Sequence, residues 1–118
     1  MINSKKYEWH KIAESDTEIQ SGEGKLRIVE LNGKTICLTK FQDNWFAFTG
    51  TCPHAGGLLS DGYIDVAGNV VCPLHDYKFN IRTGQNVSGE GYLLKTYPLE
   101  LRADGVFIGF EESALSNR

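Results

Sequence analysis

The sequence lacks any long apolar segment. Its longest unbroken apolar run covers residues 45–48, whereas a membrane-spanning helix needs about 20 such residues. Residues 1–15 also lack the apolar core of a signal peptide. We therefore expect a soluble, cytoplasmic protein with no membrane partner.

The sequence also has no excess of basic residues. Twelve Lys and Arg residues stand against 15 Asp and Glu residues, which gives a net charge of −3. Proteins that bind nucleic acids neutralise phosphates with a basic surface, so this charge argues against a nucleic-acid partner. The length of 118 residues suits one domain with its own hydrophobic core, and we expect a single domain over residues 1–118.

Helical periodicity is absent from every long stretch of the sequence. Short alternating runs with 13 glycines instead predict an all-β fold, either a small sandwich or a barrel. Asn32-Gly33 lies between two such runs and predicts a tight hairpin, because both turn residues tolerate a positive φ. Further strands are expected at residues 45–49 after a turn at residues 43–44, and at residues 63–66, 70–72, 77–81, 93–101 and 106–110. Pro98 suggests an edge strand, and residues 111–118 suggest a loose tail.

Cysteine is scarce, with three residues in all, so a disulfide framework is not expected. Cys37 lies in a predicted strand and is expected in the core, and His10 is expected to be solvated. The other two cysteines and the other two histidines lie in two short motifs, Cys52-Pro53-His54 and Cys72-Pro73-Leu74-His75, with 17 residues between them. Each motif offers one thiolate and one imidazole, and together they predict a four-ligand metal site.

Two metal centres fit this set of ligands. One is a structural zinc ion, and the other is a [2Fe–2S] cluster in which two histidines replace two cysteines on one iron. Zinc fingers usually pair like ligands, whereas each motif here carries one ligand of each kind. Gly56-Gly57 would let the backbone approach a bulky inorganic group closely. The mixed pairing favours the cluster.

Both motifs resemble the cluster-binding boxes of Rieske proteins. The resemblance rests on Cys52-Pro53-His54-Ala55-Gly56-Gly57 and on Cys72-Pro73-Leu74-His75-Asp76, and it extends over residues 7–110. It is greatest to the small Rieske ferredoxins of ring-hydroxylating oxygenases and to the small subunits of NAD(P)H nitrite reductases. It implies three small antiparallel sheets, with a cluster-binding subdomain at about residues 51–80.

The resemblance further implies a one-electron carrier that is not itself an enzyme and holds one Rieske-type [2Fe–2S] cluster. Cys52 and Cys72 would bind one iron, and His54 and His75 the other. Gly56, Gly57, Leu74 and Tyr77 would surround the cluster. The expected donor is a flavin-dependent NAD(P)H reductase, and the expected acceptor is a terminal oxygenase. A small subunit bound to the large subunit of a nitrite reductase is the alternative, and a zinc-stabilised binding module is a third possibility.

The sequence departs from the high-potential Rieske proteins of respiratory complexes. Those proteins join the two boxes by a disulfide, at positions that are Gly57 and Leu74 here. Their Ser and Tyr hydroxyls, which donate to sulfur, correspond to Tyr77 and Phe79. Fewer hydrogen bonds to sulfur stabilise the reduced cluster less, which predicts a potential near the bottom of the range of about −150 to +300 mV. Leu74 is expected either to shield the cluster or to form an apolar rim around it.

Overall fold

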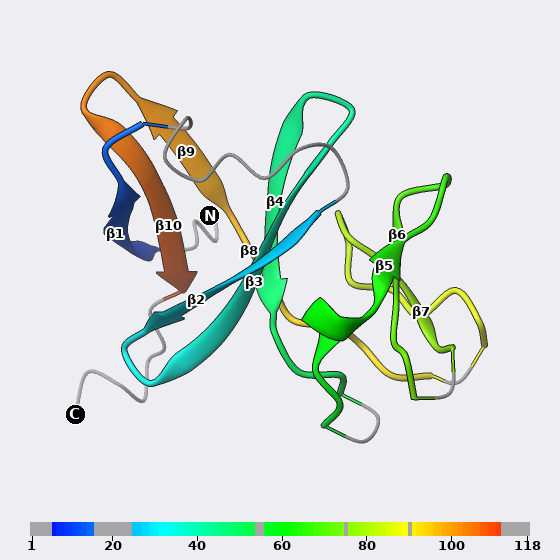
Figure 1. The fold of residues 1–118 in the computed structure, drawn as a ribbon. Helices are drawn as coiled ribbons and strands as arrows, with labels where there is room; N and C mark the ends of the chain where they lie inside the picture. Colours follow the sequence, from blue (N-terminus) through cyan, green and yellow to red (C-terminus); the bar gives the residue numbers. More distant parts are fainter. Residues whose placement is uncertain (1–5, 16–24, 54–55, 75, 90, 112–118) are drawn as a thin grey trace, which may run out of the picture. The chain divides into compact units, whose positions relative to one another are not determined.

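The computed structural model describes residues 6–15, 25–53, 56–74, 76–89 and 91–111. These residues form ten strands and one short 3₁₀ helix (Figure 1). No helix among them is long and apolar enough to cross a membrane. The elements are β1 (Tyr7–Ala13), β2 (Leu26–Leu31), β3 (Lys34–Phe41), β4 (Asn44–Thr49), η2 (Leu59–Asp61), β5 (Tyr63–Ile64), β6 (Asn69–Val71), β7 (Lys78–Asn80), β8 (Thr96–Tyr97), β9 (Leu99–Arg102) and β10 (Gly105–Glu111).

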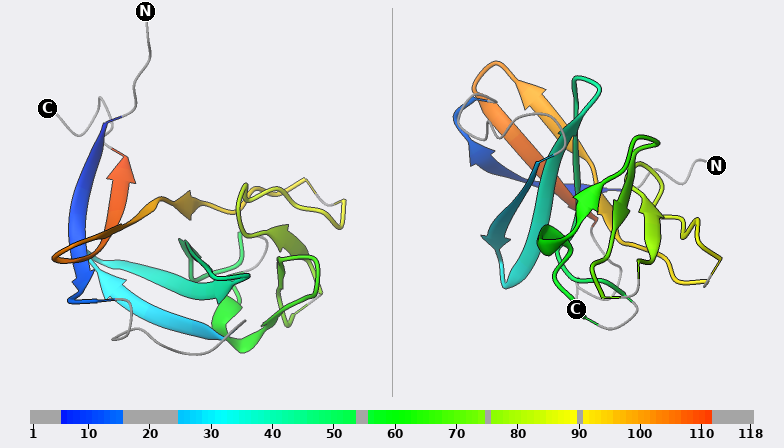
Figure 2. Two further views of the ribbon diagram at one scale, coloured as in Figure 1. Left: turned by 90° about the horizontal axis from the view of Figure 1, so that it is seen from above. Right: turned by 45° about the vertical axis from the view of Figure 1, so that its right-hand side comes forward.

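The strands form three small sheets, as expected. Their orders are β1-β10-β9, β2-β3-β4-β8 and β5-β6-β7. The chain divides into two compact units, of which one contains residues 1–20 and 97–118 and the other residues 21–96. The second unit holds both predicted metal-binding motifs. In it, η2 lies beside β2 (Figure 2, left).

Two tight turns shape the meander from β2 to β4. Asn32 and Gly33 have φ values of 52° and 76°, which confirms the predicted hairpin between β2 and β3. The next turn lies one residue earlier than predicted. Gln42 and Asp43 take the left-handed conformation, with φ values of 52° and 66°, while Asn44 already pairs with Phe41 in the sheet. Two adjacent left-handed residues close this hairpin, so the extended Asn44 belongs to the strand.

Several other predicted boundaries are wrong. The bounds of β6, β7 and β10 each differ by one residue at both ends from the predicted residues 70–72, 77–81 and 106–110. Residues 93–101 form two strands rather than one, because Pro98 separates β8 from β9; β9 is an edge strand, as Pro98 suggested. Glu111 pairs with Tyr7 at the end of β10, so the loose tail does not begin there, and residues 112–118 lie outside the described residues.

His10 is half-buried rather than solvated, since its ring packs 5.1 Å from the ring of Phe110.

Another wrong boundary is the end of β5, which stops at Ile64 because Asp65 begins a turn. The carboxylate of Asp65 accepts hydrogen bonds from the N–H groups of Ala67 (2.9 Å) and Asn69 (3.0 Å) and from the Asn69 side chain (3.2 Å). Burial acts to raise the pKa of Asp65, but these donors and the charge of Lys78 lower it below its usual value. Asp65 is therefore a structural turn residue.

Asp65→Asn is expected to lower the free energy of unfolding by about 1–3 kcal/mol at pH 7, because hydrogen bonds to a charged group are lost. The folded protein lowers the pKa of Asp65, so its contribution is present above the pKa of the unfolded state, about 4, and is lost as the pH falls through the folded value. Denaturant unfolding at several pH values measures this. Asp61→Asn, at an exposed position in η2, is the control, and a difference between the two variants that does not shrink in acid would contradict the prediction.

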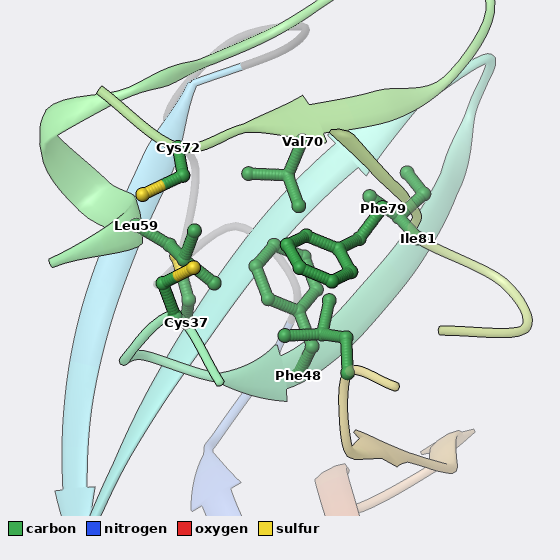
Figure 3. Packing of buried hydrophobic residues seen from close by; sticks show 9 residues of the cluster. Cys37, Phe48, Leu59, Val70, Cys72, Phe79 and Ile81 are labelled. Atoms are coloured by element: carbon green, nitrogen blue, oxygen red, sulfur yellow. The ribbon is translucent and has the colours of Figure 1, made fainter. Parts of the chain in front are cut away.

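The hydrophobic core of the second unit lies between the sheet of β2 to β4 and the sheet of β5 to β7. Phe48 and Phe79 are fully buried and lie among aliphatic side chains (Figure 3). Cys37 lies in the same cluster, as expected, and burial raises the pKa of its thiol to about 12. Cys52 and Cys72 belong to this cluster too, so the core reaches the predicted metal-binding motifs.

Candidate metal centre

The first motif forms a tight loop, residues 52–57, which we call the first ligand loop. The N–H of Cys52 donates to the carbonyl of Gly57 at 2.8 Å, and the N–H of Gly56 donates to the carbonyl of Cys52 at 2.9 Å. Both polar backbone groups of Cys52 are thus bound within the loop. Gly56 is left-handed, with φ 76°, which turns the chain back toward its start.

The second motif forms a loop of the same design, residues 72–77, the second ligand loop. The N–H of Cys72 donates to the carbonyl of Tyr77 at 2.9 Å, and the N–H of Asp76 donates to the carbonyl of Cys72 at 3.0 Å. Asp76 is left-handed, with φ 58°, at the same distance from its cysteine as Gly56. Two segments of different sequence therefore hold a cysteine in the same backbone arrangement.

The shared left-handed position yields a prediction. Gly56→Val and Asp76→Val are each expected to lower the free energy of unfolding by about 1–2 kcal/mol, because a branched side chain is strained at positive φ. Asp76→Gly is expected to change it by less, since relief of strain opposes the greater freedom of glycine in the unfolded chain. Denaturant unfolding of the three variants measures the effects. Equal stability of Asp76→Val and the unmodified protein would contradict the equivalence of the loops.

The two ligand loops meet at Gly57 and Leu74. A Cβ placed on Gly57 would lie 2.7 Å from Cδ1 of Leu74 and 3.6 Å from Sγ of Cys72. A side chain at position 57 would therefore displace Leu74, so the glycine permits the close approach of the loops. Leu74 is 52% exposed while it covers Gly57, and both of its expected roles, shield and rim, remain predictions.

The predicted ligands are only partly described. Cys52 and Cys72 are buried, and neither forms a disulfide. His54 and His75 lie outside the described residues. Among the residues that the structure describes, no group of three or more His, Cys, Asp and Glu side chains could hold a metal. Two buried cysteines outside any disulfide, each on a loop that also contains a histidine, form a donor set that fits a cluster with mixed ligands.

The other residues expected near the centre have structural contacts. Tyr77 lies at the end of the second ligand loop, and its ring is 5.9 Å from the ring of Tyr92. Phe79 is fully buried in the core and has no hydroxyl to offer to a sulfur. No pattern in the sequence indicated Asn86 and Ser88, whose side chains reach the residue after the second ligand loop. Only the pairing of residues far apart in the chain reveals them.

Comparisons with known proteins give a consistent result. Residues 8–98 match the Rieske [2Fe–2S] domain family. A ferredoxin component of naphthalene 1,2-dioxygenase and salicylate 5-hydroxylase systems from Ralstonia sp. is 30% identical over 90 residues, which cover 75% of this chain and 86% of the relative.

Solved structures share the fold. One is from a complex of reduced oxygenase and oxidised ferredoxin in carbazole 1,9a-dioxygenase, with a TM-score of 0.75, 25% identity, and coverage of 89% of this chain and 95% of that chain. Another is a putative NADH-dependent nitrite reductase small subunit from Mycobacterium tuberculosis, with a TM-score of 0.76, 19% identity, and coverage of 91% and 98%.

Proposed function

The chain belongs to the Rieske [2Fe–2S] domain family, and on this premise we propose that it is a one-electron carrier between a flavin-dependent NAD(P)H reductase and a terminal oxygenase. Its cofactor is one Rieske-type [2Fe–2S] cluster. The family match begins and ends in the unit of residues 1–20 and 97–118 and spans all of the other unit, which supports treating residues 1–118 as one domain. The protein carries electrons and is not itself an enzyme in this proposal.

The proposed ligands are Cys52 and Cys72 for one iron and His54 and His75 for the other. The observation that carries this assignment is the pair of ligand loops, which hold two buried cysteines, neither of them in a disulfide, in the same backbone arrangement. A cluster held by these four residues would supply one-electron redox chemistry.

The protein's own residues hold and shield this centre. The hydrogen bonds at Cys52 and Cys72 fix both cysteine backbones before the metal binds, which reduces the entropy lost on binding. Leu59 and Phe79 are fully buried in the cluster of core residues that contains both cysteines, so this side of the site excludes water. Because Phe79 offers no hydroxyl to a sulfur, we expect a potential near the bottom of the Rieske range of about −150 to +300 mV.

An oxygenase is the favoured acceptor. The relative from Ralstonia is named as a ferredoxin component of such systems, and the carbazole dioxygenase structure is a complex of a ferredoxin with its oxygenase. A nitrite reductase small subunit is the second candidate, and at 19% identity that likeness supports the fold alone. The cytoplasmic location and the flavin-dependent donor stay predictions.

Low-temperature EPR of the purified protein before and after dithionite tests the proposal. A silent oxidised sample that becomes rhombic on reduction, with an average g value below that of all-thiolate clusters, is the expected result. A colourless protein with stoichiometric zinc would overturn the electron-carrier function and support a metal-stabilised binding module.

The acceptor is tested separately. Reduced protein is mixed with a purified ring-hydroxylating oxygenase or with a nitrite reductase large subunit, and reoxidation is followed by absorbance. Faster reoxidation by the oxygenase supports the proposal. A stable complex with the nitrite reductase subunit on size exclusion would favour the alternative.

A further inference from the structure

The residue that follows the second ligand loop is held by a distant segment. The N–H of Lys78 donates to Oγ of Ser88 at 3.0 Å, and the carbonyl of Lys78 accepts the N–H of Val87 at 2.8 Å. One short segment, residues 86–88, thus binds both polar backbone groups of Lys78. We call this segment the clamp.

Asn86 ties the clamp together. Its side-chain amide donates to the carbonyl of Lys78 and to Oγ of Ser88, both at 3.3 Å. Asn86 also forms a β-bridge with Phe79, whose side chain is fully buried in the core. The clamp is therefore anchored to the core of the unit, and it reaches from there to the end of the second ligand loop.

A second contact holds the same end of the loop. The rings of Tyr77 and Tyr92 lie 5.9 Å apart at an angle of 32°. Tyr77 is half-buried and packs against the core cluster, whereas Tyr92 is 40% exposed. Tyr77 and Lys78 are adjacent in sequence. Tyr92 thus packs against the first of them, and the clamp binds the second.

These contacts connect directly to a proposed ligand. The carbonyl of Tyr77 accepts the N–H of Cys72 at 2.9 Å, so the position of Tyr77 and Lys78 sets the position of the Cys72 backbone. If Lys78 lost its acceptor at Ser88, the end of the second ligand loop would move more freely, and water would reach the metal centre more easily. Water stabilises the more negative, reduced state of a cluster and so raises its potential.

We infer that Ser88 is a positioning residue for the metal centre: its hydroxyl fixes the end of the second ligand loop and limits the access of water to the cluster. This inference rests on the proposed function, because it takes Cys72 and His75 as ligands. Ser88 itself lies outside the ligand loops, and its side chain acts on the centre through the backbone of Lys78.

The test compares three variants of the cluster-loaded protein. Ser88→Ala is expected to lose the cluster to a chelator about twofold to tenfold faster than the unmodified protein, the factor that one hydrogen bond provides, and to have a higher reduction potential. Ser88→Thr keeps the hydroxyl and is expected to match the unmodified protein. Thr83→Ala is the matched control, because Thr83 is also exposed and its Oγ accepts the N–H of Gln85 at 3.2 Å in the same region of the chain.

Backbone exchange supplies a readout that does not depend on electron transfer. Hydrogen–deuterium exchange of peptides that cover residues 72–79 is expected to be faster in Ser88→Ala than in Thr83→Ala. The inference is overturned if Ser88→Ala matches the unmodified protein in potential and exchange, or if Thr83→Ala shows the same changes. Failure of the proposed function is distinguishable from both results, because the unmodified protein would then lack the [2Fe–2S] EPR signal.

Discussion

Cys72→Ala is expected to yield a folded protein that has lost its colour, its EPR signal and nearly all of its iron and sulfide. The thiol of Cys72 is fully buried and free, and the proposal makes it one of only two thiolates that bind the cluster. The cluster stabilises the loops that bind it, so its loss is also expected to speed backbone exchange in residues 52–57 and 72–77. Iron and sulfide analysis and visible absorption measure the result.

Cys37→Ala is the matched control for this variant. Cys37 is a third buried cysteine in the same core cluster, and burial raises the pKa of its thiol to about 12, so at neutral pH it remains a protonated packing residue. It is expected to retain the iron and the EPR signal at the cost of some core packing. A Cys72→Ala protein with full iron content would refute the ligand assignment.

The double variant Gly57→Cys/Leu74→Cys is expected to form a disulfide between the two ligand loops. A Cβ on Gly57 would lie 3.0 Å from Cγ of Leu74, which a cysteine sulfur would approximately replace. A Cβ in a disulfide lies about 3 Å from the partner's sulfur, given an S–S bond of about 2.05 Å. Closing a loop of this length is expected to raise the free energy of unfolding of the metal-free protein by up to about 3 kcal/mol.

Mass spectrometry after thiol alkylation counts the free cysteines, and denaturant unfolding with and without a reductant measures the stability. The single variants Gly57→Cys and Leu74→Cys are the controls and are expected to show no dependence on the reductant. Two additional free thiols in the oxidised double variant would show that the loops do not meet as the structure has them.

The sequence alone predicted a large part of this protein. Asn32-Gly33 specified a hairpin because local backbone preferences belong to the residues themselves. Cys52 and Cys72, each close to a histidine, indicated the metal centre because ligand chemistry depends on residue type and short spacing. The missing helical periodicity predicted the all-β fold, and the three small antiparallel sheets followed from the family resemblance.

Other features were decided only by the tertiary structure. The meeting of Gly57 and Leu74, and the clamp of Ser88 on Lys78, join residues that are far apart in the sequence. Such contacts depend on which strands pair and in which register, and a single sequence does not encode them in any local pattern. The turn at Gln42 is a further example. Phe41 pairs with Asn44, so the turn lies one residue before the position that local backbone preference predicted. Local chemistry thus indicates which residues we propose as metal ligands, and long-range pairing decides which contacts hold their loops.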